Sequence, residues 1–522
     1  MSSSLVNLKV KEPVWAQRSE QIFVGKDVLE LLSSSMYVDP LSMYREYIQN
    51  AADAYDVLRE AGSTDHAGKV EITIDRQDRR ILIRDFGHGL NEISFYRDLT
   101  SIGGSKKRGT TARGFRGVGR LAGLAYCQEL VFRSRPHKGK AIYELRWDAR
   151  KIRSLLRSPE ATLDLAGIVS ESVQSRTLPV FDAPPHFFEV ELRGVVRHGN
   201  DRLLDTGAVS QYLGQVAPVP FRQDFTFGRE IVDYLSMRGA KGHPLHIEML
   251  GVGQVFRPHA DQLALPNGKS ITFTRLETFD TSDRDGNPAA ASWILHHDYG
   301  GALPKNSNIS GWRLRFGDIQ VGANNLLEDL YPESRFNAWT VAESHILDRK
   351  IVPNGRRDNF EQSAFYSDVL TRLTPHVREI AQLCRSSSIN RNLRQRIQEG
   401  LLSCEESVAI ASKKRTPTRV VMTVAEEVER RLNALVLTAK RGLLSEEESA
   451  ELASRIKKIK SRLKSLQERG GSAEQLAEFS VSKRRMLNEV FEAVYESDLT
   501  FSRADELIGK IISRLRRTKQ NR

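Results

Sequence analysis

The chain has 522 residues, 40% of them apolar, which is enough for about three domains that each bury a core. This length and composition exclude a small disulfide-stapled scaffold and a wholly disordered chain. Lys and Arg number 78 against 66 Asp and Glu, and the formal charge of +12 favours an acidic partner such as a nucleic acid, an anionic lipid or a nucleotide.

Cysteine spacing and hydropathy indicate the compartment. Cys127, Cys384 and Cys404 lie far apart, with no CxxC pair and no histidine at zinc-ligand spacing. We therefore expect reduced, packed thiols, with neither a disulfide framework nor a structural metal. No run of 18 or more apolar residues would span a bilayer, and the first residues lack the apolar core of a signal peptide. The sequence predicts a soluble, cytoplasmic protein without a membrane partner.

The first predicted elements are two helices and a hairpin. Apolar residues at steps of three and four predict helix over residues 26–62. Asp39-Pro40 breaks this stretch in two, because the residue before a proline avoids the helical region. The alternating runs Val70–Ile74 and Arg80–Arg84 flank a polar turn and predict a β-hairpin.

Residues 103–119 are rich in glycine and basic residues and predict a mobile loop that leads into a helix at Leu121–Leu130. Further strands are expected at Glu129–Ser134, Ala141–Trp147 and Phe187–Leu192. These elements predict one sheet with helices on one face, which is an α+β sandwich.

Residues 200–360 mix helical and strand patterns and predict a second α+β domain, with short strands at Leu245–Leu250, Ser270–Arg275 and Trp312–Phe316. Beyond about residue 362 the patterns are helical, over Val421–Ala439 and from Ser445 to Arg469. Ser445 and Glu448 have the spacing of a capping box. The second of these stretches carries an apolar stripe of Leu452, Ile456, Ile459, Leu463 and Leu466. Such a stripe predicts helical hairpins or a dimeric coiled coil.

The first chemical motif lies in the second predicted helix. Glu46, Asn50 and Asp53 recur at steps of four and three and so share one face. A carboxylate one turn from a carboxamide suits a Mg-nucleotide hydrolase, in which one group deprotonates water and the other reaches the metal. A solvated polar face of an amphipathic helix is the alternative interpretation.

The second motif, Asp85-Phe86-Gly87-His88-Gly89, ends a predicted strand. Asp85 is a short acceptor for the exocyclic amine of adenine, and Gly87 and Gly89 let the backbone approach a base or ribose. The third motif is Gly114-Phe115-Arg116-Gly117-Val118-Gly119, whose N–H groups precede a helix and suit phosphates. Either motif alone is also compatible with an ordinary turn.

In this order, within the 74 residues from Glu46 to Gly119, the three motifs resemble those of the GHKL ATPases, the superfamily of gyrase, heat-shock protein 90, histidine kinases and MutL. That resemblance implies ATP bound in a GHKL (Bergerat) α/β sandwich. The chain has no GxxxxGK[ST] P-loop, and its glycine loop lacks the βαβ context of a Rossmann site.

Within this superfamily the chain is most similar to the heat-shock protein 90 chaperones, first over Val28–Tyr37 and the helix that holds Glu46. Ile351–Glu361 then resembles the middle-domain loop that brings an arginine to the γ-phosphate. Arg357 is the aligned arginine and Arg356 the second candidate, while two basic residues on a surface loop are the alternative.

The resemblance implies bound ATP and Mg²⁺, with Glu46 and Arg357 catalytic and Asn50 at the metal. The implied cofactor contacts are Asn50, Asp53, Asp85, Gly87, Gly89, Ser105, Lys106, Gly114, Gly117, Val118 and Gly119. The implied domains are an ATP-binding domain at 1–200, a middle or transducer-like α+β domain at 201–365 and a basic helical region at 366–522.

Three features depart from the chaperone pattern. The lid segment Gly103–Lys107 and the GFRG sequence at 114–117 look more like MutL. The family's threonine before a late strand has no match near His186–Phe188, and nothing after about residue 365 resembles the chaperone dimerisation domain.

The resemblance implies a slow ATPase that uses lid and domain closure, as a homodimer, to act on protein partners. The alternatives are a nucleic-acid clamp of the MutL, topoisomerase or MORC kind and a nucleotide-dependent scaffold. Residues 381–522 hold 29 Lys and Arg against 19 Asp and Glu, so most of the excess charge lies in the helical tail. That region is the candidate contact for a nucleic acid, although a solvated helix face accounts for its charge equally well.

Overall fold

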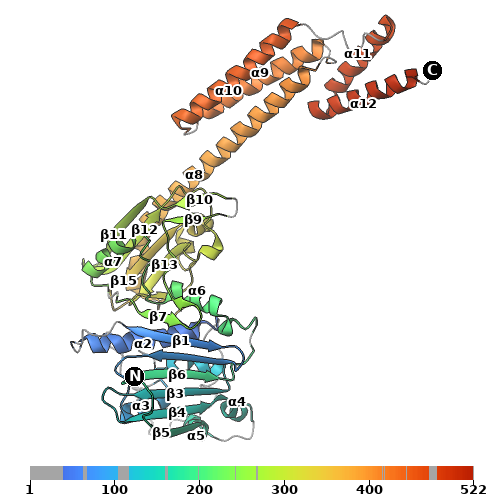
Figure 1. Cartoon of the computed structure of the whole chain (residues 1–522). Helices are drawn as coiled ribbons and strands as arrows, with labels where there is room; N and C mark the ends of the chain where they lie inside the picture. The colour runs from blue at the N-terminus through green and yellow to red at the C-terminus, as the bar shows by residue number, and fades with distance from the viewer. Residues whose placement is uncertain are drawn as a thin grey trace, which may run out of the picture. The chain divides into compact units, whose positions relative to one another are not determined.

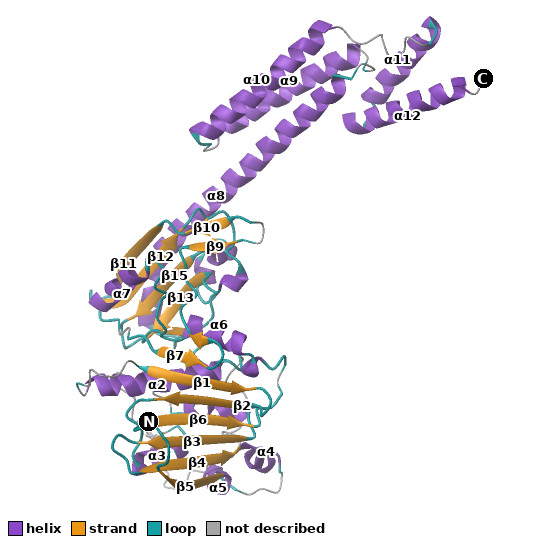
Figure 2. Ribbon diagram, in the orientation of Figure 1, coloured by secondary structure: helices purple, strands orange, loops and turns teal. Residues whose placement is uncertain are grey.

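The computed structural model describes residues 39–60, 62, 68–103, 117–158, 163–197, 199–240, 243–265, 268–413, 416, 418–441, 444–469 and 479–520. The chain divides into two compact units, one made of residues up to His297 with Ala302–Val377 and the other of Asp298–Gly301 with residues from Arg378 onward. The first unit mixes helices and strands, and the C-terminal region is helical (Figure 2). The expected α+β class with a helical C-terminal region is confirmed at this level.

An eight-stranded sheet forms one part of the larger unit (Figure 1). Its strands, in spatial order, are β5 (Val173–Pro179), β4 (Ala141–Asp148), β3 (Glu129–Arg135), β6 (Phe187–Arg193), β2 (Arg80–Asp85), β1 (Lys69–Asp75), β7 (His246–Met249) and β8 (Gly253–Gln254). β1 and β2 pair antiparallel with Val70 opposite Asp85, which confirms the predicted hairpin. The strands expected near residues 129, 141 and 187 are also present.

The edge of this sheet differs from the expectation. β7 was expected in the second domain, but it pairs parallel with β1, with Val70 opposite Ile247. The reason is burial, since Ile247 and Met249 belong to the apolar core beneath the first sheet. Sequence-distant segments thus share one core, and the division into three domains stays a prediction.

Helices cover one face of the eight-stranded sheet. They are α2 (Ser42–Glu60), α3 (Glu92–Thr100), α4 (Ala149–Arg157) and α5 (Leu165–Ser172). Their apolar residues share a core with Ile83, Phe132 and Trp147 of the strands. The helix expected over Leu121–Leu130 is wrong in type and length, because a 3-10 helix ends at Ala125 and β3 begins at Glu129. The first helix expected before Asp39 lies outside the described residues.

A five-stranded sheet forms the other part of the larger unit. Its order is β11 (Arg275–Ser282), β12 (Pro288–His296), β15 (Val341–Ile346), β13 (Gly311–Phe316) and β14 (Ile319–Val321). Nearby lie α6 (Thr206–Val216), α7 (Gly228–Met237) and the short pair β9 (Gln262–Ala264) and β10 (Ser270–Thr272). The strand expected at Trp312–Phe316 is confirmed, whereas the one expected from Ser270 to Arg275 ends at Thr272. α6 contacts both α2 and β14, so it joins the parts built on the two sheets.

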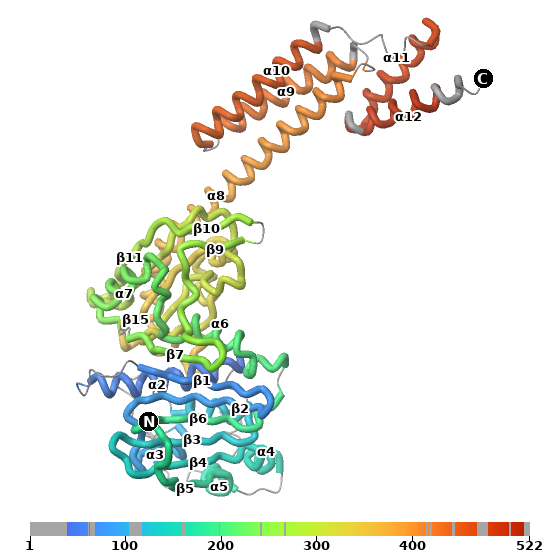
Figure 3. Tube along the Cα trace, in the orientation of Figure 1, coloured from blue at the N-terminus to red at the C-terminus, as the bar shows by residue number. Residues whose placement is uncertain are grey.

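The C-terminal region contains α8 (Ala364–Ala411), α9 (Thr418–Arg441), α10 (Glu446–Arg469), α11 (Val481–Glu496) and α12 (Phe501–Gln520) (Figure 3). The predicted capping box is present, because Ser445 Oγ accepts the Glu448 N–H at 3.2 Å and the Ser445 N–H donates to Glu448 Oε2 at 2.9 Å. The predicted apolar stripe of α10 packs in a core with α8 and α9. The Gly470-Gly471 pair, whose residue types favour a turn between helices, lies outside the described residues.

Two smaller expectations concern thiols and membranes. The three cysteines are buried and form no disulfide bond, as expected. Among the described residues, no helix combines the length and the apolar character that crossing a bilayer requires.

Candidate functional site

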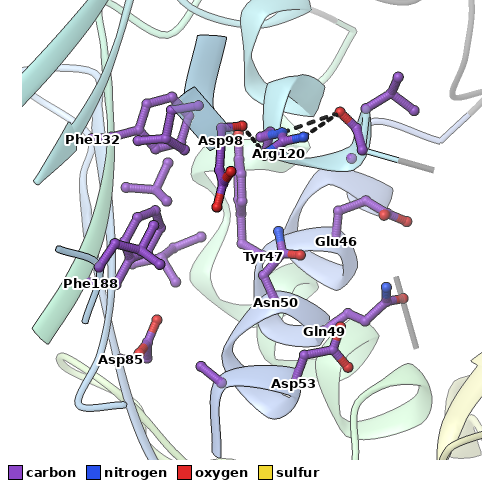
Figure 4. A pocket seen from close by; sticks show the side chains of 18 of the residues that line it. Glu46, Tyr47, Gln49, Asn50, Asp53, Asp85, Asp98, Arg120, Phe132 and Phe188 are labelled. Atoms are coloured by element: carbon purple, nitrogen blue, oxygen red, sulfur yellow. Dashed lines mark hydrogen bonds between the residues drawn. The ribbon is translucent and has the colours of Figure 1, made fainter. Parts of the chain in front are cut away.

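A cavity of about 330 Å³ lies between α2, the eight-stranded sheet and the segment 353–357. Figure 4 shows Glu46, Asn50 and Asp53 projecting from one helix, with Asp85 and Phe188 across from them. The cavity brings together most of the described site residues that the sequence indicated, namely Glu46, Asn50, Asp53, Asp85, Gly89, Gly117, Val118, Gly119 and Arg357. Gly87 lies beside Asp85, whereas Ser105, Lys106 and Gly114 fall outside the described residues.

Helix α2 orients the first motif through its apolar face. Ile48 and Ala51 are buried in the core against the sheet. Glu46, Asn50 and Asp53 occupy the opposite face and line the cavity, as the helical spacing predicts. The carboxylates of Glu46 and Asp53 are nearly buried, so the polar face of this helix is not a solvated one.

Asp85 is placed by the turn that follows β2. Its carboxylate is 6% exposed and accepts the Gly87 N–H at 2.9 Å. Tyr55 of α2 supports the same turn, since its hydroxyl accepts the Phe86 N–H at 3.0 Å. Burial raises the pKa of Asp85 to about 7, although the Gly87 N–H acts in the opposite direction. The structure therefore places a poorly solvated carboxylate at this end of the cavity.

The wall beside Asp85 is apolar. Ile83, Phe132, Phe188 and Val190 line it, and the rings of Phe132 and Phe188 lie 6.1 Å apart between centroids. These residues were missed as site residues. The alternation of β2, β3 and β6 is the signal that places them on the core face with α2. Phe188 belongs to the segment in which the sequence showed no match for the family's threonine, and it contributes an aromatic ring to this wall.

The glycine motif contacts the other end of α2. A Cβ at Gly119 would collide with the Glu46 carboxylate, so a larger residue here would require that carboxylate to move. Arg120 holds the segment in place, because its guanidinium donates to the Gly117 carbonyl at 3.0 Å and to the Ser101 carbonyl at 3.3 Å. Gly117, Val118 and Gly119 thus line the cavity next to Glu46.

Arg357 reaches the same cavity from the chain after the second sheet. Its Nε lies 3.6 Å from Glu46 Oε1, and its side chain is only 8% exposed. Arg356 is exposed, so the structure favours Arg357 over Arg356 as the arginine inside the cavity.

The backbone of Arg357 is held in an unusual conformation. Its φ of 56° lies in the left-handed region, which costs a non-glycine residue of order 1 kcal/mol or more. Gly322 donates its N–H to the Arg357 carbonyl at 2.9 Å. Arg45, next to Glu46 on α2, donates to the Arg356 carbonyl at 3.0 Å and to the Arg357 carbonyl at 3.4 Å. One α2 residue therefore fixes the loop that brings Arg357 to Glu46.

These observations define a mixed α+β protein with a cavity that has an apolar wall beside Asp85 at one end and the buried charges of Glu46 and Arg357 at the other. No protein-family model matches the chain. Part of it is 33% identical over 104 residues to Chaperone protein HtpG of Sulfurovum sp. (strain NBC37-1), which is 19% of this chain and 16% of that protein. Chaperone protein HtpG of Rickettsia typhi is 36% identical over 86 residues, 15% of this chain and 14% of that protein.

Chaperone protein HtpG of Aliarcobacter butzleri is 33% identical over 104 residues, 18% of this chain and 16% of that protein. The chain therefore matches only about a seventh of the length of these relatives. Such partial similarity supports a relation to the heat-shock protein 90 family for the matched part of the chain.

Proposed function

We propose that this protein is an ATPase of the GHKL type that binds Mg-ATP in the α2 cavity and hydrolyses it slowly. One observation carries the proposal. Arg357 lies 3.6 Å from Glu46 although the two residues are far apart in the sequence, and the same cavity holds Asp85 and the Gly117–Gly119 backbone. A base, a buried cation and phosphate-type N–H donors in one cavity are what phosphoryl transfer to water requires.

The residues present fit a magnesium nucleotide. The cavity volume of about 330 Å³ is within the roughly 300–1,000 Å³ of small-molecule sites. Among the described residues, Glu46 Oε1 accepts no hydrogen bond, so this buried oxygen has acceptor capacity left for water. Asn50 offers a carboxamide oxygen, which is a ligand type that Mg²⁺ accepts alongside water and phosphate oxygens.

In the proposed mechanism, Glu46 accepts a proton from the water that attacks the γ-phosphorus, as the bond to the ADP oxygen breaks. Arg357 neutralises the negative charge that develops on the transferring group. Gly117–Gly119 donate N–H groups to phosphate oxygens, and Asp85 accepts from the base. Mg²⁺, when bound, withdraws charge from the phosphate oxygens. The similarity to heat-shock protein 90 chaperones implies slow turnover, limited by closure of the site around the nucleotide.

Replacing Asp85 with asparagine should abolish measurable nucleotide binding. The carboxamide keeps an acceptor for the Gly87 N–H but presents a weaker acceptor, or a repelling N–H, to an exocyclic amine. Isothermal titration with ATP measures the effect, and Asp78→Asn, in the exposed turn of the same hairpin, is the matched control. Wild-type affinity in Asp85→Asn would contradict the assignment.

The same variant should stabilise the empty protein at pH 8. The folded-state pKa of Asp85 is raised from 3.8 to about 7, so its ionisation costs stability as the pH rises from about 4 to 7. Asparagine does not ionise, so the variant should gain at most about 4 kcal/mol in free energy of unfolding for this three-unit difference in pKa. Thermal unfolding should show the gain at pH 8 and its loss near pH 4, whereas an equal difference at both pH values would refute this origin.

Arg45 should act as a positioning residue for the arginine loop. Arg45→Met removes the donors to the Arg356 and Arg357 carbonyls. The loop then no longer holds the Arg357 guanidinium in place, and kcat should fall by about 10- to 100-fold. ATP affinity should change little, and Arg45→Lys should recover part of the rate through one donor. A matching loss of affinity, or no difference between the two variants, would exclude a positioning role.

The proposal extends to a chaperone-like role as a homodimer that acts on protein partners. Its support is the partial similarity to proteins named as chaperones. The described part of the helical region provides hairpins such as α9 with α10, which are suitable for contacts with a partner. The ATPase test and the partner test are separate, because the candidate site lies entirely in the larger unit.

A further inference from the structure

A second cavity, of about 370 Å³, lies apart from the candidate ATP site and shares no lining residue with it. It lies between segment 219–226, helix α7 and one face of the five-stranded sheet. Its size is also within the roughly 300–1,000 Å³ of small-molecule sites. The proposed ATPase activity makes no use of it.

The sheet face beneath this cavity is unusually charged. β13 and β15 pair parallel with Arg313 opposite Glu343 and Arg315 opposite His345, so these four side chains share one face. Each of them is at most 3% exposed. A strand face covered by other elements is normally apolar, so four buried ionisable groups there call for a physical explanation.

Part of the explanation is an ion-pair network. Arg257 lies 2.7 Å from Asp318 and 2.8 Å from Glu343, and Arg315 lies 2.7 Å from Glu343. Burial alone would raise the pKa of Glu343, but Arg315 and Arg257 outweigh it and hold the pKa well below its usual range. Glu343 is therefore a charged partner of two arginines, and Asp318 forms an ion pair with Arg257.

The network contains one more positive group than negative groups. Arg257, Arg313 and Arg315 have Glu343 and Asp318 as their acidic partners among the described residues. Three guanidinium groups then face two carboxylates when the histidines are uncharged. An excess charge away from water is costly unless a counter-charge compensates it.

The cavity reaches this network directly. Arg257, Asp318 and His345 line its floor. Phe221, Val232 and Leu235 line its walls, and the Arg257 guanidinium lies 4.8 Å from the centre of the Phe221 ring. Two further arginines, Arg222 and Arg229, line it with largely exposed side chains and lie 3.7 Å from Asp224 and 3.8 Å from Asp233, respectively. The buried Arg257 borders a network with one excess positive charge, so this lining, with its apolar walls and two outer arginines, suits an anion with an apolar body.

We propose that this cavity binds a small amphipathic carboxylate, with an aromatic or branched apolar body and one carboxylate group. Arg257 has five N–H groups and uses three of them, for the Val219 carbonyl, Glu343 and Asp318. The remaining two can donate to the carboxylate, whose charge offsets the excess of the network. The apolar body then contacts Phe221, Val232 and Leu235, and a cationic ligand is rejected because it would add to the excess.

Phenylacetate is a suitable probe, with phenylacetamide and phenethylamine as its neutral and cationic analogues. Titration of the full chain should give a Kd of about 1 mM or lower for phenylacetate. Binding should be at least about tenfold weaker for phenylacetamide and undetectable for phenethylamine. Equal binding of phenylacetate and phenylacetamide, or no saturable binding of phenylacetate, would overturn the proposal.

Substitutions locate the probe. Val232→Trp places a large side chain into the cavity from the partly exposed face of α7 and should weaken phenylacetate binding at least about tenfold. Val252→Trp, at a similarly exposed valine outside the cavity, is the matched control and should bind as the wild type does. Arg229→Gln, an exposed change, should weaken phenylacetate but not phenylacetamide.

Unfolding temperatures show whether each variant is folded. Unchanged binding by a folded Val232→Trp protein, or displacement of phenylacetate by ATP, would place the probe elsewhere and refute the site. These results do not depend on hydrolysis, so the outcome is independent of the proposed ATPase function.

Discussion

Replacing Glu46 with alanine is expected to lower ATP turnover by about 10²- to 10⁴-fold, which is the usual contribution of a general base. The carboxylate is nearly buried in the cavity and lies 3.6 Å from both Arg45 and Arg357. ATP binding should persist or tighten, because the change removes a negative charge from a site for triphosphate. Single-turnover hydrolysis and a separate binding titration distinguish the two effects.

Two further variants sharpen this test. Glu46→Gln keeps the shape of the side chain but cannot accept a proton, so it should be as inactive as Glu46→Ala. Glu92→Ala, at an exposed acid in the first turn of α3, should leave turnover unchanged. Normal hydrolysis by Glu46→Ala would remove the base assignment, and a joint loss of binding would make Glu46 a structural residue of the cavity.

Periodicity was sufficient to predict the elements that surround the candidate site. The step of four and three residues placed Glu46, Asn50 and Asp53 on one face because α2 is a regular helix with an apolar opposite face. Alternation likewise predicted β1 and β2 as a hairpin, because one face of the sheet is buried.

Local sequence patterns gave wrong predictions where pairing between distant segments determines the structure. β7 has the alternation of any short strand, and only its parallel pairing with β1 shows that it belongs to the first sheet. The segment after Gly119 looks apolar and helical, yet close contact with α2 confines it to a 3-10 turn, where the Gly123 N–H donates to the Tyr47 hydroxyl. Neither constraint is visible in a window of neighbouring residues.

The same limit applies to the candidate sites. Asp85 and the glycines were apparent from local motifs, but the apolar wall of Phe132 and Phe188 depends on which strands are neighbours. The buried network of Arg257, Glu343 and Asp318 was missed entirely, because it joins three segments that are distant in the sequence. Arg357 was found only through family resemblance, because its loop carries no periodic signal.

Removing the Arg357 side chain should lower kcat by about 10²- to 10³-fold while leaving ATP affinity within a few fold, since a preorganised donor of this kind acts mainly in the transition state. The backbone contacts of this loop do not depend on that side chain. Gly322 and Arg45 bind the carbonyl groups of Arg356 and Arg357, which alanine retains. Arg357→Lys should keep only part of the rate, because an ammonium lacks the planar fork of a guanidinium.

Arg356→Ala is the matched control, because Arg356 precedes Arg357 in the same loop and its side chain is exposed. Only its carbonyl takes part in the contact with Arg45, and alanine preserves that carbonyl. Full activity in Arg356→Ala, combined with the loss in Arg357→Ala, would localise the effect to one guanidinium. The opposite result would shift the assignment by one residue. Wild-type turnover in both variants would leave a nucleotide-binding cavity whose chemistry does not involve the loop. A buried cation 3.6 Å from the Glu46 carboxylate cannot be removed without consequence if it meets the γ-phosphate.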